Sequence, residues 1–435
     1  MRATELYEHQ KEALQQTSDK NKVAYYHDMG LGKTYTGGEK MMQIGAPVNL
    51  VVCQKSKIDD WIEHFKTNYH YDYLIFDLTD AKKFKYFFDD EIYSNKKSEL
   101  KIIGVINYDL VWRRPELKAL HDFTLMLDES SLIQNERAKR SKFIMRLNYE
   151  NLILLSGTPT GGKYERLYSQ LKMLGYDITK KSFYNMYVNF HYDDRQGFPL
   201  MIIDGYKNVE RLKRKMRQYG CHFLKTQEVL DLPEQNFVPV KLKTAPEYKK
   251  FMRAGIVTVD GMELVGDTTL TKLLYARMLC GAYCKEKLAA FRELAEGTDD
   301  RLIIFYNFNA ELDALKCVCD ALERPYSVVN GKDKDLYAYE HENASITLIQ
   351  YQAGAMGLNL QKANKIIYFT PPLSSEIYEQ SKKRIHRIGQ KNTCFYYNLI
   401  CAGSVEEKIY NVLAMRKDYT EALFEKEGRE HEQKI

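Results

Sequence analysis

The chain has 435 residues, 44% of them hydrophobic and 28% charged, and a formal net charge of +5 at pH 7. That hydrophobic content supports sizeable cores and excludes a wholly disordered protein. No apolar run approaches the roughly 18 residues that a membrane helix needs, which excludes a membrane-spanning protein. The first ten residues lack the apolar stretch of a secretory signal, so we expect a cytoplasmic protein. The small net charge predicts that any nucleic-acid surface is local.

Short apolar runs alternate with helical patterns in the first half of the chain. The runs have the length of buried strands, and the helical patterns cover 59–69 and 136–147. Strands that alternate with helices indicate a parallel sheet covered on both faces, which binds ligands at the carboxyl ends of its strands. The predicted strands are 23–26, 49–53, 101–106, 123–127 and 152–155.

The middle of the chain differs from both halves in composition and in its predicted elements. Residues 163–225 are rich in aromatic and basic residues, and we expect them to be largely helical. Asp231-Leu232-Pro233 indicates a linker. An Asp-Gly pair between apolar flanks predicts a hairpin over 256–266, followed by a helix over 270–284.

The second half repeats the strand and helix alternation. Its predicted strands are 302–306, 327–329, 346–349, 366–369 and 393–400. The expected fold is therefore α/β, with two parallel-sheet lobes in tandem and helical insertions. Lobe 1 is placed at 1–230, with a helical protrusion at about 163–225. Lobe 2 is placed at 231–435, with a helical and hairpin insertion at about 245–295.

The eight cysteines do not have the spacing of a zinc site. The close pairs are C-x3-C at 280 and 284 and C-x-C at 317 and 319, and no C-x2-C pair exists. We therefore expect reduced, buried thiols and no zinc.

The strongest local motif is DMGLGKT, Asp28–Thr34, which lies between a predicted strand and a predicted helix. This context suits a phosphate-binding loop, in which backbone N–H groups and a helix N-terminus face an anion. Lys33 would neutralise phosphate charge, and Thr34 would help to hold Mg²⁺. The strict loop pattern fails because His27 occupies its first position, so a glycine-rich turn that only ends a strand stays an alternative.

Two further strands of the first half end in polar residues. LMLDES ends in Asp128, a candidate Mg²⁺ ligand, and Glu129, a candidate for orienting the attacking water. The alternative is a plain turn or helix cap. SGTPT, at 156–160, could relay the state of a bound nucleotide or be an ordinary strand-to-helix turn.

Two segments of the second half also follow strands. QAGAMGLNL, at 352–360, offers glycines and Asn359 for phosphate contacts. QSKKRIHRIGQ, at 380–390, places Arg384 and Arg387 on one helical face, which suits an arginine finger acting across a domain cleft. A solvated basic face is the alternative.

These segments, in this order, resemble helicase superfamily two, and most closely the Swi/Snf-type DNA-dependent ATPases and translocases, in a minimal form like those of phages or bacteria. RIHRIGQ together with AGAMGLNL is specific to that branch. The matching segments are 6–10, 28–34, 50–65, 105–110, 125–130, 156–174, 301–315, 352–360, 380–390 and 404–409.

The resemblance implies two RecA-like lobes, ATP and Mg²⁺ as cofactors, and a set of site residues. The catalytic residues are Lys33, Asp128, Glu129, Arg384 and Arg387, with Thr34 and Asp128 as Mg²⁺ ligands. The ATP contacts are Gln10 at adenine and Met29, Gly30, Leu31, Gly32, Lys33 and Thr34 at the phosphates. The coupling residues are Ser156, Gly157, Thr158 and Gln380. The DNA contacts are Lys55, Ser56, Lys57, Arg113, Arg114, Gly354, Gly357 and Asn359.

The sequence departs from the family pattern at two places. Ser130 and Ser131 follow the Asp-Glu pair, where the family carries Gly-His or Ala-His, which puts coupling to the 156–160 segment in doubt. Gly37 and Gly38 lie early in the predicted helix after the loop, where each costs about 1 kcal/mol against alanine. Close packing on the sheet would explain them. The basic run at 211–217 lies outside the motifs and is interpreted as a solvated face, with a DNA contact on a helical insertion as the alternative.

The resulting hypothesis is a DNA-stimulated ATPase that translocates on double-stranded DNA. It would hydrolyse ATP between the lobes and contact DNA phosphates without sequence preference. A strand-separating DNA or RNA helicase is the alternative, and a nucleic-acid-binding scaffold with a dead ATPase is a third. The hypothesis places the protein on the bacterial nucleoid or, if phage-encoded, in the host cytoplasm, and leaves room for an unidentified protein partner.

Overall fold

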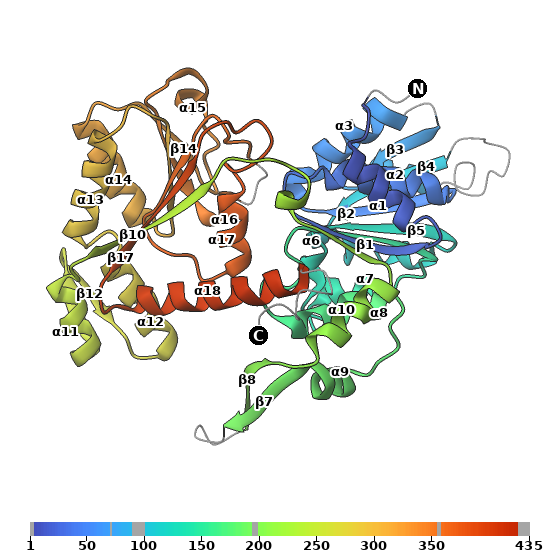
Figure 1. Ribbon diagram of the computed structural model, residues 1–435, viewed down its shortest axis with the longest axis horizontal. Helices are drawn as coiled ribbons and strands as arrows, with labels where there is room; N and C mark the ends of the chain where they lie inside the picture. The colour runs from blue at the N-terminus through green and yellow to red at the C-terminus, as the bar shows by residue number, and fades with distance from the viewer. Residues whose placement is uncertain (1–3, 70–71, 89–100, 194–198, 355–357, 425–435) are drawn as a thin grey trace, which may run out of the picture. The chain divides into compact units, whose positions relative to one another are not determined.

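The computed structural model describes the chain except residues 1–3, 70–71, 89–100, 194–198, 355–357 and 425–435 (Figure 1). The described residues up to Val229, together with those from Tyr419 to Phe424, form one compact unit, and Leu230–Asp418 form the other. No helix among the described residues is long and apolar enough to cross a membrane.

Unit 1 is built on a seven-stranded sheet in which every pair of neighbours is parallel. The strand order is β3-β4-β2-β5-β6-β1-β9. Its central strands are almost wholly apolar because both faces of the sheet are buried. The strands are β1 Lys22–His27, β2 Val48–Cys53, β3 Tyr73–Asp77, β4 Lys101–Asn107, β5 Phe123–Asp128, β6 Asn151–Ser156 and β9 Cys221–Leu224.

Alternate side chains of each strand enter two separate cores. On β1, Val23 and Tyr25 join one core, whereas Ala24 and Tyr26 join the other. The first core packs against α1 (Glu8–Gln16), α2 (Lys33–Ile44) and α3 (Ile58–Tyr69). The second packs against α4 (Ala81–Phe87), α6 (Tyr108–Val111), α7 (Lys139–Ile144) and α8 (Leu167–Met173).

The two glycines early in α2 are explained by their contacts with neighbouring side chains. A Cβ atom on Gly37 would lie 2.7 Å from Cδ1 of Leu155 on β6. A Cβ atom on Gly38 would lie 2.7 Å from Nε2 of the buried His64 on α3. Both positions therefore need glycine because α2 packs closely on the sheet and on α3.

The expectation of a largely helical segment at 163–225 is only partly correct. The segment holds α8, α9 (Lys180–Tyr187) and α10 (Val209–Gln218), but an antiparallel hairpin of β7 (Val188–Asp193) and β8 (Leu200–Tyr206) lies between the last two. It also supplies β9, the edge strand that pairs with β1. The helix predicted over 136–147 is shorter and spans only α7.

Unit 2 contains a six-stranded sheet of order β10-β17-β16-β13-β15-β14, again parallel throughout. The five predicted strands are confirmed, and 302–306 has the predicted bounds. β10, which the sequence analysis missed, pairs with β17 along its whole length. The strands are β10 Gln235–Leu242, β13 Leu302–Tyr306, β14 Tyr326–Val329, β15 Ile346–Gln350, β16 Lys365–Tyr368 and β17 Cys394–Cys401.

Helices again cover both faces of this sheet, which confirms two parallel α/β lobes in tandem as the fold class. One core packs against α13 (Lys285–Glu296) and α14 (Asn309–Ala321). The other packs against α15 (Tyr337–His341), α16 (Tyr351–Gly354), α17 (Ser375–Lys382) and α18 (Val405–Phe424).

A small separate core lies between β10 and α13 in the sequence. It is formed by α11 (Pro246–Ala254), the hairpin β11 (Ile256–Val259) and β12 (Met262–Val265), and α12 (Thr269–Cys280). The predicted hairpin is confirmed, and its turn residues Asp260 and Gly261 have φ of +48° and +78°. Positive φ at both positions is what a two-residue hairpin turn requires. The predicted helix over 270–284 ends earlier, at Cys280.

Candidate active site

The DMGLGKT segment connects the end of β1 to the start of α2. Gly30 and Gly32 have φ of +91° and +70°, which favours glycine at both positions. Gly32 is the N-cap of α2, so the N–H groups of the first helical turn follow the loop directly. A Cβ atom on Gly32 would lie 2.3 Å from Nε2 of Gln10. The loop thus has the backbone form that an anion-binding helix N-terminus requires.

Two side chains of α1 hydrogen-bond to backbone carbonyls of the loop. Gln10 Nε2 donates to the carbonyl oxygens of Leu31 and Gly32, at 3.2 and 3.1 Å. His9 Nε2 hydrogen-bonds to the Leu31 carbonyl at 3.1 Å. Gln10 therefore lies at the loop, and its contact with adenine stays a prediction.

Lys33 lies where the loop, β1 and the 156–160 segment meet. Its ammonium donates to the carbonyls of His27 and Asp28, at 3.0 and 3.3 Å. A Cβ atom on Gly157 would lie 3.3 Å from Lys33 Nζ and 3.1 Å from Cγ of Met29. Gly157 thereby leaves room for the ammonium, while Thr34 is the second residue of α2 and is half-buried.

His27, which breaks the strict loop pattern, is fully buried. Its Nε2 lies 2.9 Å from Nδ1 of His222 on β9, within hydrogen-bonding distance. Burial, and then the neighbouring His222 and Lys33, hold the pKa of His27 well below its ordinary value. The imidazole is therefore neutral and adds no charge beside the loop.

Asp128 and Glu129 follow β5 at the same edge of the sheet. Trp61 Nε1 donates to Asp128 Oδ2 at 2.9 Å, and the Tyr108 hydroxyl donates to the Asp128 carbonyl at 2.8 Å. Burial raises the pKa of Asp128, and the Trp61 hydrogen bond and the Lys33 ammonium oppose that rise. The carboxylate is thus held in one orientation near the loop lysine.

Glu129 has an unusual backbone conformation. Its φ and ψ are +52° and +59°, the left-handed region, which a residue with a Cβ adopts rarely. Such a conformation costs about 1–3 kcal/mol and persists only where neighbouring contacts fix it. A strained glutamate directly after the metal-ligand candidate is typical of a catalytic position.

The 156–160 segment lies between these two groups because β6 is between β5 and β1 in the sheet. Ser156 Oγ accepts a hydrogen bond from the Thr158 amide at 3.2 Å, and both residues are buried. The sequence analysis gave no role to Tyr108 or to Gln170. Both lie inside segments that the resemblance covers, 105–110 and 156–174, but no motif residue marks either of them; Gln170 contacts Ser130 and Pro159.

These residues fit a nucleoside triphosphate with Mg²⁺. The loop amides and the Lys33 ammonium suit phosphate oxygens, and the hydroxyl of Thr34 and the carboxylate of Asp128 are oxygen ligands of the kind that Mg²⁺ prefers. Glycine at 32 and 157 leaves space that a side chain would fill.

The predicted unit 2 residues lie around α17. Arg384 is buried, and its carbonyl accepts the Leu360 amide at 3.1 Å. Arg387 Nη1 donates to Oδ1 of Asn359, and partial burial lowers the pKa of its guanidinium. A hydrogen bond thus links Arg387, a candidate arginine finger, to Asn359, a candidate DNA contact. Gln380 is half-buried on α17.

The remaining DNA candidates do not form one set. Lys55 and Arg113 line one open hollow of about 620 Å³ in unit 1. Lys57 is paired with Asp60 at 2.6 Å, and Arg114 lies 4.5 Å from the ring centre of Phe84. Ser56 is exposed, Gly354 ends α16, and Gly357 lies outside the described residues.

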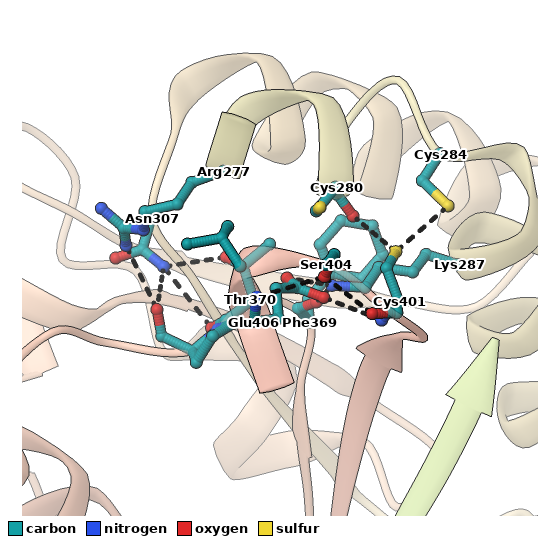
Figure 2. Close-up of polar contacts among 12 residues, drawn as sticks. Arg277, Cys280, Cys284, Lys287, Asn307, Phe369, Thr370, Cys401, Ser404 and Glu406 are labelled. Atoms are coloured by element: carbon teal, nitrogen blue, oxygen red, sulfur yellow. Dashed lines mark hydrogen bonds and ion pairs between the residues drawn. The ribbon is translucent and has the colours of Figure 1, made fainter. Parts of the chain in front are cut away.

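Unit 2 also has a buried polar cluster, drawn in Figure 2. In the described part of the chain, Cys280, Cys401 and Glu406 are the one group whose ligand atoms are close enough to hold a metal ion. Both carboxylate oxygens of Glu406 are already used, Oε1 by Lys287 and Oε2 by the Cys401 amide. The Lys287 ammonium therefore supplies the positive charge at this position. All eight cysteines are free thiols.

Comparison with protein families identifies the chain. The model of the SNF2-related domain matches residues 9–287, and that of the helicase conserved C-terminal domain matches residues 286–389. The chain belongs to the SNF2-related family. Both models are those of helicase-type ATPases, and the SNF2-related match covers the loop, Asp128, Glu129 and the 156–160 segment.

Individual relatives of this SNF2-related chain are distant. A mouse SWI/SNF-related matrix-associated actin-dependent regulator of chromatin, subfamily A member 1, is 23% identical over 88% of this chain and 39% of its own length. The putative ATP-dependent helicase/translocase YwqA of Bacillus subtilis is 23% identical over 72% of this chain and 37% of its own length. The chain therefore spans about two fifths of the length of these relatives.

A solved structure, the Sulfolobus solfataricus SWI2/SNF2 ATPase core in complex with dsDNA, is also similar. It is 20% identical, has a TM-score of 0.45, and covers 97% of this chain and 93% of its own.

Proposed function

We propose that this SNF2-related chain is a DNA-dependent ATPase that translocates on double-stranded DNA. One observation carries the ATPase part of the proposal. The phosphate loop with Lys33, the carboxylates of Asp128 and Glu129, and the 156–160 segment lie at one edge of one sheet, on the adjacent strands β1, β5 and β6.

Each of these residues has a role in ATP hydrolysis. The loop amides and Lys33 bind the phosphates, and Thr34 and Asp128 hold Mg²⁺, which neutralises charge on the phosphates when bound. Glu129 accepts a hydrogen bond from the attacking water and orients it toward the γ-phosphate. Arg384 and Arg387 stabilise charge in the transition state when the two units close on the nucleotide.

Phosphate contacts are the expected basis of DNA binding. Lys55 and Arg113 line one hollow near the ends of β2 and β4, so they are the first candidates for the DNA backbone. Contacts of this kind do not depend on DNA sequence. They weaken as the salt concentration rises, because the free energy gained by releasing counterions from the DNA becomes smaller. Duplex translocation needs no more than such contacts, alternating between the two units during the ATPase cycle.

The alternative, a strand-separating helicase, has one structural feature in its favour. The β7–β8 hairpin carries Tyr192 with 60% of its surface exposed, and an exposed aromatic residue can stack on a base. The experiment below therefore includes strand separation as an outcome.

The test measures ATP turnover without nucleic acid, with duplex DNA and with RNA, and in parallel the displacement of a third strand from a triplex and the unwinding of a forked duplex. We expect strong stimulation by duplex DNA, ATP-dependent triplex displacement and little unwinding, all fading as salt rises. Glu129→Gln is the control. This variant should bind ATP but orient the attacking water poorly, so it should lose both ATP turnover and triplex displacement. Efficient unwinding or stimulation by RNA alone would replace the proposal with the alternative.

A further inference from the structure

A single buried amide, that of Gln170 on α8, contacts three segments that carry the candidate site. Its Oε1 accepts hydrogen bonds from the hydroxyls of Ser130, at 2.8 Å, and Tyr26, at 3.0 Å. Its Nε2 donates to the carbonyl of Pro159 at 2.9 Å. Tyr26 lies on the strand that enters the phosphate loop, Ser130 follows Glu129, and Pro159 belongs to the 156–160 segment.

The three contacts depend on one another. Gln170, Ser130 and Tyr26 are completely buried, so no solvent replaces a contact that is lost. A buried polar group left without a partner costs about 1–3 kcal/mol. A shift of the Pro159 carbonyl would therefore move the amide, and the amide would move the Ser130 hydroxyl with it.

Ser130 is also the place where this sequence departs from the pattern of its family, in which a glycine or alanine follows the Asp-Glu pair. Neither of those residues has a hydroxyl to donate. The Ser130 side chain thus supplies the donor that joins the segment after Glu129 to Gln170. The departure creates a link to the 156–160 segment instead of removing one.

The link acts directly beside the strained residue. Glu129 keeps its left-handed backbone only while its neighbours are fixed, and Ser130 is its immediate neighbour. Fixing the Ser130 side chain therefore restrains the direction of the Glu129 carboxylate.

We propose that Gln170 is a positioning residue that couples the 156–160 segment to the orientation of Glu129. The inference rests on the proposed function, because the 156–160 segment would report DNA binding and Glu129 would orient the attacking water. DNA bound to the protein would fix the 156–160 segment, and the Gln170 amide would transmit this to Ser130. Gln170 itself is completely buried, so it would act through Ser130 and Pro159 and not on the nucleotide directly.

The experiment compares the ratio of DNA-stimulated to basal ATP turnover in Ser130→Ala, Gln170→Leu and the double variant. Leucine keeps the volume of the side chain without its amide, and alanine removes a single hydroxyl. We expect each single variant to lower the ratio about tenfold through kcat, with KM for ATP nearly unchanged, because a coupling network of this kind changes rates within this range. The double variant should be no worse than Gln170→Leu.

Two conservative variants serve as matched controls. Ser141→Ala removes a buried hydroxyl that has no hydrogen-bond partner among the described residues. Tyr25→Phe removes a buried hydroxyl that hydrogen-bonds to Thr17. Tyr25 precedes Tyr26 on β1, but its hydroxyl does not contact Gln170. Both should keep the wild-type ratio, whereas Tyr26→Phe should lower it.

The outcomes separate the inference from the proposed function. A wild-type protein that duplex DNA does not stimulate would contradict the proposed function and the inference together. A stimulated wild-type protein whose Ser130→Ala and Gln170→Leu variants keep its ratio would overturn the inference alone. Additive losses in the double variant would also overturn it, because they would show that Ser130 and Gln170 act independently. An equal fall in basal and stimulated rates would overturn it too, because it would indicate general destabilisation.

Discussion

Lys287 Nζ lies 2.6 Å from Oε1 of Glu406, and both side chains are completely buried (Figure 2). The same ammonium donates to the Phe369 carbonyl at 2.6 Å. This pair joins α13 to the beginning of α18 inside unit 2, in a region where neither charge can be hydrated. The attraction offsets a large desolvation cost, so the pair is sensitive to the loss of one partner.

Lys287→Met should destabilise unit 2 by about 3–5 kcal/mol because it leaves the Glu406 carboxylate buried without its cation. The double variant Lys287→Met with Glu406→Gln should recover much of the loss. Urea unfolding followed by circular dichroism measures this. Both tryptophans, Trp61 and Trp112, lie in unit 1, so the fluorescence transition should stay in place. Equal loss in the single and double variants would contradict the expectation.

Lys33→Ala should abolish ATP turnover and leave the fold intact. The Lys33 side chain is half-buried, donates hydrogen bonds to the carbonyls of His27 and Asp28, and is not part of either hydrophobic core, so alanine should not disturb the packing. Turnover and the urea midpoint are measured on the same sample, with Lys66→Ala, at an exposed lysine of α3 outside the candidate contacts, as the control. DNA-stimulated turnover that survives in Lys33→Ala would show that the phosphate site has been placed wrongly.

Arg387→Ala should lower kcat by about a thousandfold and change ATP affinity much less, because an arginine finger acts on charge in the transition state. Arg384 is buried and Arg387 only partly so, which favours Arg387 as the mobile contact. Single-turnover kinetics and equilibrium binding of ATP separate the two effects. A loss of affinity at constant kcat would instead make Arg387 a ground-state contact and Arg384 the finger.

Gly37→Ala should destabilise unit 1, although alanine is the better helix former. The gain in helix propensity is about 1 kcal/mol, but the new methyl would lie 2.7 Å from Leu155 and 3.0 Å from Met126. Overpacking of this kind costs about 1–3 kcal/mol. Urea unfolding followed by circular dichroism, which reports both units, measures the change, and Gly331→Ala, whose Cβ meets nothing within 4 Å, is the neutral control. A stabilised Gly37→Ala protein would mean that α2 can move away from the sheet.

Glu311 gives a prediction about pH. Burial raises the pKa of this carboxyl from 4.5 to about 7, although the amides of Asn307 and Phe308 oppose the rise. The folded state therefore holds the proton more tightly than the unfolded state, and the stability that Glu311 contributes is lost as the pH rises from about 4.5 to 7. The loss is on the order of 3 kcal/mol.

Unfolding by urea between pH 5 and pH 8 measures this contribution in the wild type and in Glu311→Gln. Glutamine keeps an acceptor for both amides but does not titrate, so the advantage of the wild type should shrink across this range. Parallel pH curves for the two proteins would show that Glu311 is ionised in the folded state throughout.

Most strands could be predicted because parallel strands with two buried faces are continuous apolar runs. Two of the strands that were missed, β9 and β10, lack this pattern, whereas β3 was missed although it is an apolar run. β10 alternates exposed and half-buried residues and contains Pro239, as an edge strand can, and its partner β17 is far away in the sequence. β9 is four residues long and follows a strongly basic helix, so its sequence looked like part of a helical segment.

The candidate site residues also fall into those that the sequence indicated and those that it could not indicate. Lys33, Asp128 and Glu129 could be proposed from the sequence because Lys33 stands in a glycine-rich loop between a strand and a helix, and Asp128 and Glu129 stand at the end of an apolar strand. Gln170 could not, because a single glutamine on an amphipathic helix is ordinary. Its contacts with Ser130 and Tyr26 join residues 40 and 144 positions apart, which only the folded chain brings together.

The position of β9 in the sequence also affects the order in which the parts of unit 1 can fold during synthesis on the ribosome. Thr226, just after β9, donates from its amide and its hydroxyl to Asp28 Oδ2, the first residue of the loop, across 198 positions of sequence. Until β9 emerges, β1 is an open edge with unpaired backbone groups, and the nascent chain can bind a neighbour there. The nucleotide loop, encoded near the start, is thus among the last parts of unit 1 to reach its final form.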